Sequence, residues 1–285
     1  MRLTPVTSGP SGFCFRLIDM KHSKFAVIVL TLVMAFLYLP ILVLIVDSFN
    51  ASKFGGEWTG FTLKWYGALF SPRNRDIWIA FERSLLVAGI ATVGSCVLGT
   101  TAALALHRWK GRLQTTHYSL IYTPLVMPEI LMGISLLMMF TAIGMQCGML
   151  TIIIAHITFC VSYVTMTVLA RLQDFDDRVI EAAYDLGASP WYAFWKVTLP
   201  ILLPGIVAGG LLAFTLSIDD FVITFFVTGP GADTLPLKIY SMIKHSRQMP
   251  VINSLSTMML VMTCVLVAVS RFVSNRRRHL PKARK

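Results

Sequence analysis

The stretch Glu181–Pro200, EAAYDLGASPWYAFWKVTLP, is a polar interruption between two long apolar runs of the chain. Gly187 suits the left-handed position that ends a helix, and Ser189 followed by Pro190 is typical of the start of another helix. Small and apolar residues recur before the glycine at the spacing of one helix face: Val179, Ala182, Ala183 and Leu186. The stretch therefore predicts a knob of two short helices joined at a glycine.

Two interpretations of this knob are open from its residues alone. The small alanines on one side allow another protein surface to approach closely. Trp191 and Trp195, on the aromatic side with Phe194, would equally serve as interfacial anchors of an elbow that lies on a bilayer.

The composition around the knob is that of an integral membrane protein. The chain has 285 residues, of which 55% are hydrophobic and 14% are charged, whereas soluble domains carry about 25% charged residues. So few charges cannot cover a soluble core, so we expect an all-α integral membrane protein. The five cysteines show no C-x-x-C spacing, and we interpret them as packing residues rather than disulfides or metal ligands.

Six apolar runs each have a length near the roughly 20 residues that a helix needs to cross the hydrocarbon core. Strands of a membrane barrel would alternate with period two over about ten residues, and no run shows that pattern. We therefore predict six transmembrane helices, over residues 25–46, 84–106, 119–142, 149–170, 201–227 and 251–272. They leave an N-terminal tail of residues 1–24, with Met20 as a candidate for the natural start, and a basic tail of residues 273–285.

The basic residues give the chain an orientation. With both termini on one side, that side carries 17 Lys and Arg residues and the opposite side carries 8. By the positive-inside rule both termini and the knob, within the loop 171–199, are expected in the cytoplasm. The net charge of +11 is then a consequence of topology, and nucleic acid is not an expected partner. The run Arg276–Arg278 is expected to touch anionic lipid.

The spacing within the knob also resembles the EAA loop of bacterial ABC importer permeases. In that family the loop is a coupling helix that seats in a cleft of a cytoplasmic ATPase, and the resemblance places this role on Glu181, Ala182, Ala183 and Gly187. Val197 stands where isoleucine is commoner. The matching positions keep fixed gaps: Glu181-Ala182-Ala183, three residues, Gly187, nine residues, Val197, one residue, Leu199-Pro200.

Other segments are similar to the second permease subunit of polyamine importers for putrescine or spermidine. The similarity covers nearly all of the chain from residue 25 onward. It is carried by SFNASKF (48–54), KWYGALF (64–70), PLVMPEILMGISLL (124–137), HITFC (156–160) and FTLSIDDFVITFFVTGPGADTLPLKIYSM (214–242).

This resemblance implies a type I importer permease of the bacterial inner membrane, spanning residues 25–272. It also implies a homologous second permease, two copies of a cytoplasmic ATPase and a periplasmic polyamine-binding protein as partners. The chain has no G-x-x-x-x-G-K-[ST] motif, so we expect it to be a transport subunit without enzyme activity or cofactor. Which polyamine is preferred is not fixed by the residues.

Acidic residues inside apolar runs are the candidates for a substrate site, because charge is costly in the membrane. Glu129 lies about 15 Å into the third span, near the midplane, at a helical rise of about 1.5 Å per residue. Pro124 and Pro128 precede it, and we expect them to break the helix. Asp219 and Asp220 lie toward the outer side, and adjacent residues of a helix point about 100° apart, so at most one of them need face the pathway.

Aromatic faces would complete a site for a polyamine, since they attract ammonium groups. Trp65, on the outer segment, is the candidate for this contact, and a place in the interfacial aromatic belt is its plainer explanation. Two alternatives to a polyamine permease stay open. One is an ABC permease for another small cationic or neutral solute, and the other is a stand-alone secondary transporter.

Overall fold

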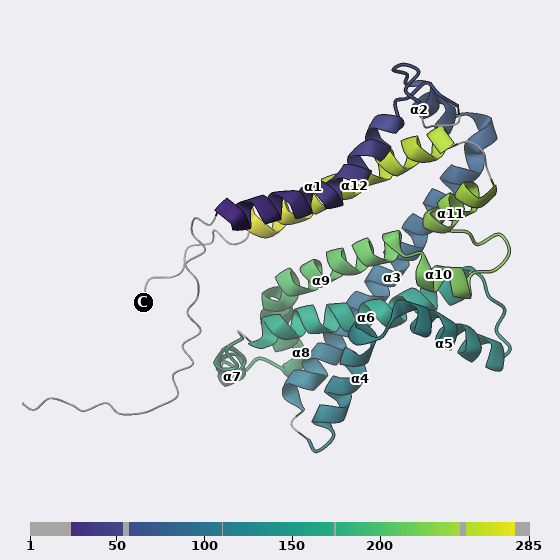
Figure 1. Ribbon diagram of the computed structural model, residues 1–285. Helices are drawn as coiled ribbons and strands as arrows, with labels where there is room; N and C mark the ends of the chain where they lie inside the picture. The colour runs from purple at the N-terminus through teal and green to yellow at the C-terminus, as the bar shows by residue number, and fades with distance from the viewer. Residues whose placement is uncertain (1–23, 54–56, 110, 174, 246–248, 277–285) are drawn as a thin grey trace, which may run out of the picture.

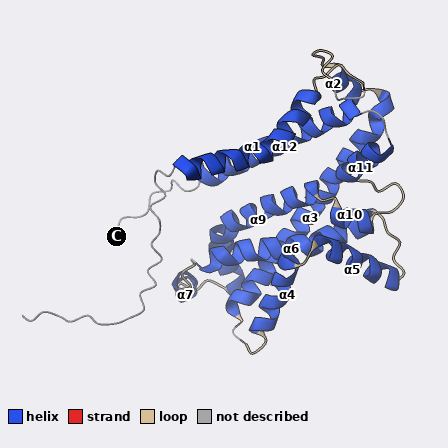
Figure 2. Ribbon diagram, in the orientation of Figure 1, coloured by secondary structure: helices blue, strands red, loops and turns tan. Residues whose placement is uncertain are grey.

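The computed structural model describes residues 24–53, 57–109, 111–173, 175–245 and 249–276, with side chains up to residue 265. Within these ranges the chain folds into helices and loops (Figure 2), and its one extended pairing is an isolated bridge between Asn50 and Phe61. The prediction of an all-α protein is confirmed. The N-terminal tail, with Met20, and most of the C-terminal tail lie outside the described residues.

The elements follow one another along the chain from the N-terminal side. They are α1 (Lys24–Asp47), α2 (Lys64–Leu69), η2 (Pro72–Asn74), α3 (Arg75–Arg108), α4 (Gln114–Val126), α5 (Glu129–Ala142), α6 (Met149–Gln173), α7 (Arg178–Asp185), α8 (Pro190–Ala193), η3 (Phe194–Thr198), α9 (Leu199–Asp219), α10 (Val222–Val227), α11 (Leu235–His245) and α12 (Met249–Arg276).

Three long helices, α3, α6 and α9, pack against one another around the main apolar core (Figure 1). Glycines let their backbones approach closely. A Cβ atom added to Gly99 in α3 would lie 2.8 Å from Cβ of Val164 in α6, and one added to Gly209 in α9 would lie 3.2 Å from Cα of Val164. The bundle is therefore held by side-chain packing over small residues, as expected of helices in a membrane.

Two of the predicted spans are broken. The run 119–142 is divided between α4 and α5, which bend by 110° at Met127 and Pro128. Proline has no backbone N–H to continue the helix, and this break was predicted.

The break between α9 and α10 was not predicted, and the expectation of one continuous helix over 201–227 is wrong. Asp220 has an extended backbone there, with φ −65° and ψ 127°. Its carboxylate accepts hydrogen bonds from the backbone N–H groups of Ile223 (3.3 Å) and Thr224 (2.8 Å). An aspartate that caps the following helix in this way stabilises the interruption.

The helices α1 and α12 run side by side and form an arm that extends from the rest of the bundle (Figure 1). At its end, α2 packs on α12. A second apolar cluster lies there and holds Leu69, Ile77, Leu235, Val251 and Leu255. The apolar window of α1 has 0% of its residues buried within the chain.

Four helical runs are long and apolar enough to cross a membrane, and they begin at Phe25, Pro72, Met149 and Pro190. The bent pair α4–α5 gives a fifth, while the described apolar part of α12, Met249–Val265, is shorter than a span. The protein is thus a multi-pass membrane protein, and the count of six stays a prediction.

The connections between these helices lie at opposite ends of the bundle. The start of α1, the end of α12, α7 and the α3–α4 connection lie toward the left and bottom of Figure 1. Toward the right and top lie α2, the α5–α6 connection and the α10–α11 connection. This arrangement agrees with the predicted alternation of loops, and the assignment of one end to the cytoplasm stays a prediction.

Candidate functional site

The knob folds as its residues predict. The helix α7 ends before Gly187, whose φ of +84° is in the left-handed region that glycine adopts most readily. Ser189 then accepts a hydrogen bond from the backbone N–H of Tyr192 at 3.3 Å, and Pro190 is the first residue of α8. Two short helices therefore meet at a glycine, outside the packed bundle.

Most of the knob's surface is left uncovered by the described residues. Glu181, Ala182 and Gly187 are exposed and Ala183 is half-buried. Leu186 is 89% exposed and Trp191 is 71% exposed. A hollow of about 600 Å³ opens on this surface, lined by Ala183, Leu186, Gly187, Ala188, Ser189, Tyr192 and Val197. Apolar side chains gathered around a hollow on a short exposed loop are typical of an interaction surface.

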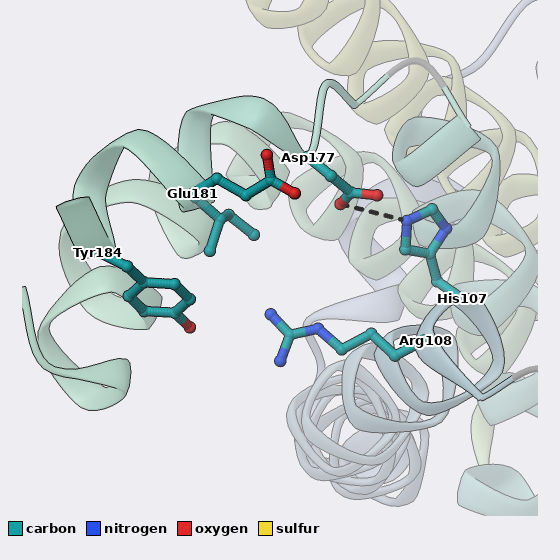
Figure 3. Close-up of a pocket in the computed structure, with 6 residues that line it drawn as sticks. His107, Arg108, Asp177, Glu181 and Tyr184 are labelled. Carbon is teal, nitrogen blue, oxygen red and sulfur yellow. Dashed lines mark ion pairs between the residues drawn. The ribbon is translucent and has the colours of Figure 1, made fainter.

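A second hollow, of about 500 Å³, separates α7 from the end of α3 (Figure 3). His107 and Arg108 line it from α3, and the guanidinium of Arg108 extends into it (Figure 3). The facing wall belongs to α7 and the residue before it. It consists of Asp177, Ile180, Glu181 and Tyr184.

Polar side chains face one another across this hollow. Nε2 of His107 lies 3.8 Å from Oδ1 of Asp177, and the two side chains are 24% and 69% exposed. The knob is thus linked to a core helix by a polar contact as well as by its chain connections to α6 and α9.

Within the membrane-spanning part, Glu129 and Asp219 are both exposed acids. Glu129 is the first residue of α5, just after the 110° bend, and Asp219 is the last residue of α9. Among the described residues neither carboxylate has a hydrogen-bond or ion-pair partner. Each is therefore available to a cation.

Asp220 has different surroundings, since its side chain is only 6% exposed. Besides its two bonds to backbone N–H groups, it accepts one from the Thr224 hydroxyl at 2.8 Å. Nε2 of His156 lies 3.3 Å away. Of the two adjacent aspartates, Asp220 is held in a buried network and Asp219 faces outward.

The helices that carry the acids pack on each other. A Cβ atom on Gly133 of α5 would lie 2.6 Å from Cδ2 of Phe226 in α10. Each of these residues is four positions past the start of its helix, so the two helix starts lie within about two turns of each other along the axis. The structure thus packs α5, which begins at Glu129, against α10, which follows the Asp219–Asp220 break.

Trp65 belongs to another part of the molecule. It packs against the second apolar cluster, formed by α2, α11, α12 and the start of α3, and its indole N–H donates to the backbone oxygen of Asn50 at 2.7 Å. The Nζ atom of Lys64 lies 4.5 Å from the centroid of its ring. The Lys64 ammonium therefore lies over the ring of Trp65, and the contact of Trp65 with a substrate stays a prediction.

Two features of the site were missed from the sequence. The first is that His107 and Arg108 face the knob across a hollow. These residues are far from the knob in the sequence, and the charge count predicts only that both lie on the same side of the membrane. The role of Asp220 as the cap of α10 was also missed. The only signal for it in the sequence is Thr224, which follows one helical turn later and donates to its carboxylate. Among the described residues, no group of three or more His, Cys, Asp or Glu side chains could hold a metal ion.

The fold is thus a membrane bundle of broken and continuous spans, with an exposed helix–glycine–helix knob at one end. The family model described as "Binding-protein-dependent transport system inner membrane component" matches residues 95–282. The chain belongs to this family and is an inner-membrane permease subunit of ABC importer type.

Curated relatives share much of the sequence. The spermidine/putrescine transport system permease protein PotC of Escherichia coli K12 is 42% identical over 245 residues, which cover 86% of this chain and 92% of that protein. The putrescine transport system permease protein PotI of the same organism is 42% identical over 247 residues, covering 84% and 86%. PotC of Haemophilus influenzae is 39% identical over 248 residues, covering 87% and 95%.

Solved structures show the same fold at low identity. A chain of a bacterial ABC transporter that imports the acidic polysaccharide alginate aligns with a TM-score of 0.68 and 16% identity, covering 90% of this chain and 96% of that chain. A chain of the MetNI methionine ABC transporter aligns with a TM-score of 0.56 and 19% identity, covering 73% and 95%.

Proposed function

We propose that the chain is one permease of an ATP-driven importer that carries putrescine, spermidine or both into the cytoplasm. The observation that supports this most strongly is the 42% identity with PotC along 86% of the chain. Such identity extends through the membrane spans and is not confined to the knob, which importers of many solutes share.

The chemistry of the exposed acids agrees with a polyamine. Putrescine and spermidine carry ammonium groups separated by methylenes, so their recognition requires carboxylates whose separation matches that of the ammonium groups. Glu129 and Asp219, both without a partner among the described residues, are the proposed ligands for these groups. In this proposal both acids line the membrane pathway, where acidic side chains mark the routes of ions and cationic substrates.

In this proposal the knob is the contact with the ATPase. Glu181, Ala182, Ala183 and Gly187 would seat against one copy of a cytoplasmic ATPase, while a homologous permease seats against a second copy. A periplasmic binding protein would deliver the polyamine at the opposite face. ATP binding would then move the knob and bias the bundle between inward-facing and outward-facing states.

The proposal is tested by uptake of radiolabelled spermidine into proteoliposomes that contain the assembled complex. Asp219→Asn and Glu129→Gln should each reduce uptake to below about one tenth of the wild-type rate, the effect of losing an interaction with a charged partner. Both variants should still assemble with the ATPase. Asp76→Asn is the matched control, because Asp76 is an acid whose side chain is 74% exposed and which pairs with Lys238 at 3.4 Å. Wild-type uptake in both pathway variants would remove the proposed site.

A further inference from the structure

We infer that His156 is a positioning residue for the substrate site, which it serves by fixing the break between α9 and α10. In this role His156 and Asp220 act together, and Asp219 alone of the two aspartates contacts the substrate. The inference rests on the proposed function. It specifies which acid contacts the ammonium group and which residues hold that acid in place.

His156 links the two helices on either side of the break. It lies on α6, is fully buried, and uses both ring nitrogens. Nδ1 lies 2.7 Å from the hydroxyl of Ser217 in α9, and Nε2 lies 2.9 Å from the hydroxyl of Thr224 in α10. An imidazole with one partner on each side of a helix break restrains the angle between the two segments.

Asp220 completes this restraint from within the break. Its carboxylate oxygens accept from the N–H of Ile223 and from both the N–H and the hydroxyl of Thr224, and Nε2 of His156 lies 3.3 Å from one of them. A substrate ammonium would have to displace these contacts, and the buried donors left behind would be unsatisfied. Asp220 is therefore committed to the fold of the break.

The same geometry suits Asp219 for a cation. Asp219 is exposed and ends α9, where the helix dipole places partial negative charge. The positive end of the α10 dipole lies next to it, and the Asp220 carboxylate offsets that charge. At this break the negative end of the α9 dipole and the Asp219 carboxylate lie together, and the Asp220 carboxylate shields the positive end of α10.

A double-mutant cycle separates positioning from simple packing. Spermidine uptake by the reconstituted complex would be measured for His156→Gln, Asp219→Glu and the double variant. Asp219→Glu keeps a carboxylate but moves it by one methylene, so uptake stays measurable. We expect each single variant to raise KM by about tenfold or more, as for a lost charged hydrogen bond. The double variant should have nearly the KM of Asp219→Glu alone, because His156 acts through the position of that acid.

Two further variants complete this experiment. Thr224→Val removes one partner of His156 at nearly constant volume, and it should reproduce the KM effect if His156→Gln does not fold. His245→Gln, on the exposed end of α11, is the matched histidine control, and its KM should equal that of the wild type. Effects of His156→Gln and Asp219→Glu that multiply independently would overturn the positioning role.

A second measurement does not depend on the cargo. Asp219→Cys, in a chain whose native cysteines are replaced, would be labelled with a permanently cationic thiol reagent, with and without His156→Gln. We expect the labelling rate to change by at least about fivefold when the restraint is lost, and an unchanged rate would overturn the inference. If the wild-type complex takes up no polyamine, the proposed function fails, and the labelling result still decides whether His156 sets the exposure of position 219.

Discussion

Nε2 of His107, in the last turn of α3, lies 3.8 Å from the carboxylate of Asp177, the residue that precedes α7. The helix α3 is one of the three that form the packed bundle, and α7 carries the knob. A displacement of the knob is therefore transmitted to α3 through this contact, as well as to α6 and α9 through the chain connections of the knob.

The first prediction concerns this contact. Because Asp177 is 69% exposed, the pair adds little to stability, and an exposed pair is worth at most about 1 kcal/mol. Asp177→Asn and His107→Gln should leave expression unchanged but reduce the amount of substrate carried per ATP hydrolysed, by up to about fivefold. Asp185→Asn, an exposed acid of α7 outside the hollow, is the control. A transport-to-ATP ratio at the wild-type value in both variants would contradict a coupling role for the contact.

The second prediction concerns Gly187. An added Cβ there would meet no atom within 4 Å, so the effect of a substitution comes from the backbone, where a left-handed conformation costs an L-residue about 1–2 kcal/mol. Gly187→Ala should uncouple ATP hydrolysis from transport partially and Gly187→Val more strongly, since a β-branched side chain is the less compatible with a positive φ. Gly187→Asn should be the mildest, because asparagine tolerates this conformation. The ratio of uptake to ATPase rate measures all three, and an equal effect of Ala and Asn would show that conformation is not the cause.

The third prediction compares two glycines of α3. A Cβ at Gly99 would lie 2.8 Å from Cβ of Val164 and 3.1 Å from the backbone nitrogen of Thr165, whereas one at Gly89 would meet nothing within 4 Å. Gly99→Ala should lower the midpoint of thermal unfolding of the purified complex, as overpacking by about 1–3 kcal/mol does. Gly89→Ala should leave the midpoint unchanged or raise it, because alanine is the better helix former. A midpoint for Gly99→Ala equal to that of Gly89→Ala would show that α3 and α6 can separate at this point.

Much of the architecture could be predicted from local pattern. The knob follows from the spacing of its alanines, from Gly187 and from the Ser189–Pro190 start of α8, because each of these features acts within one turn of the chain. The bend at Pro128 likewise follows from a missing backbone donor.

Features that depend on distant partners could not be predicted. A run of apolar residues from 201 to 227 reads as one span, because the interruption at Asp220 is stabilised by His156, 64 positions earlier in the sequence. His156 itself is buried and hydrogen-bonded to Ser217 and Thr224, and neither partner could be identified from the sequence. The ammonium of Lys64 lies over the ring of its neighbour Trp65, a contact that sequence patterns do not reveal.

The measurement that tests the central claim most directly is ATP-dependent uptake by the complete complex in proteoliposomes. Radiolabelled spermidine would be supplied with its binding protein outside and ATP inside, with putrescine as competitor. We expect uptake that requires ATP, that is inhibited by putrescine, and that neutral sugars and anionic solutes leave unchanged. A complex that assembles and hydrolyses ATP but accumulates no spermidine or putrescine would contradict the account.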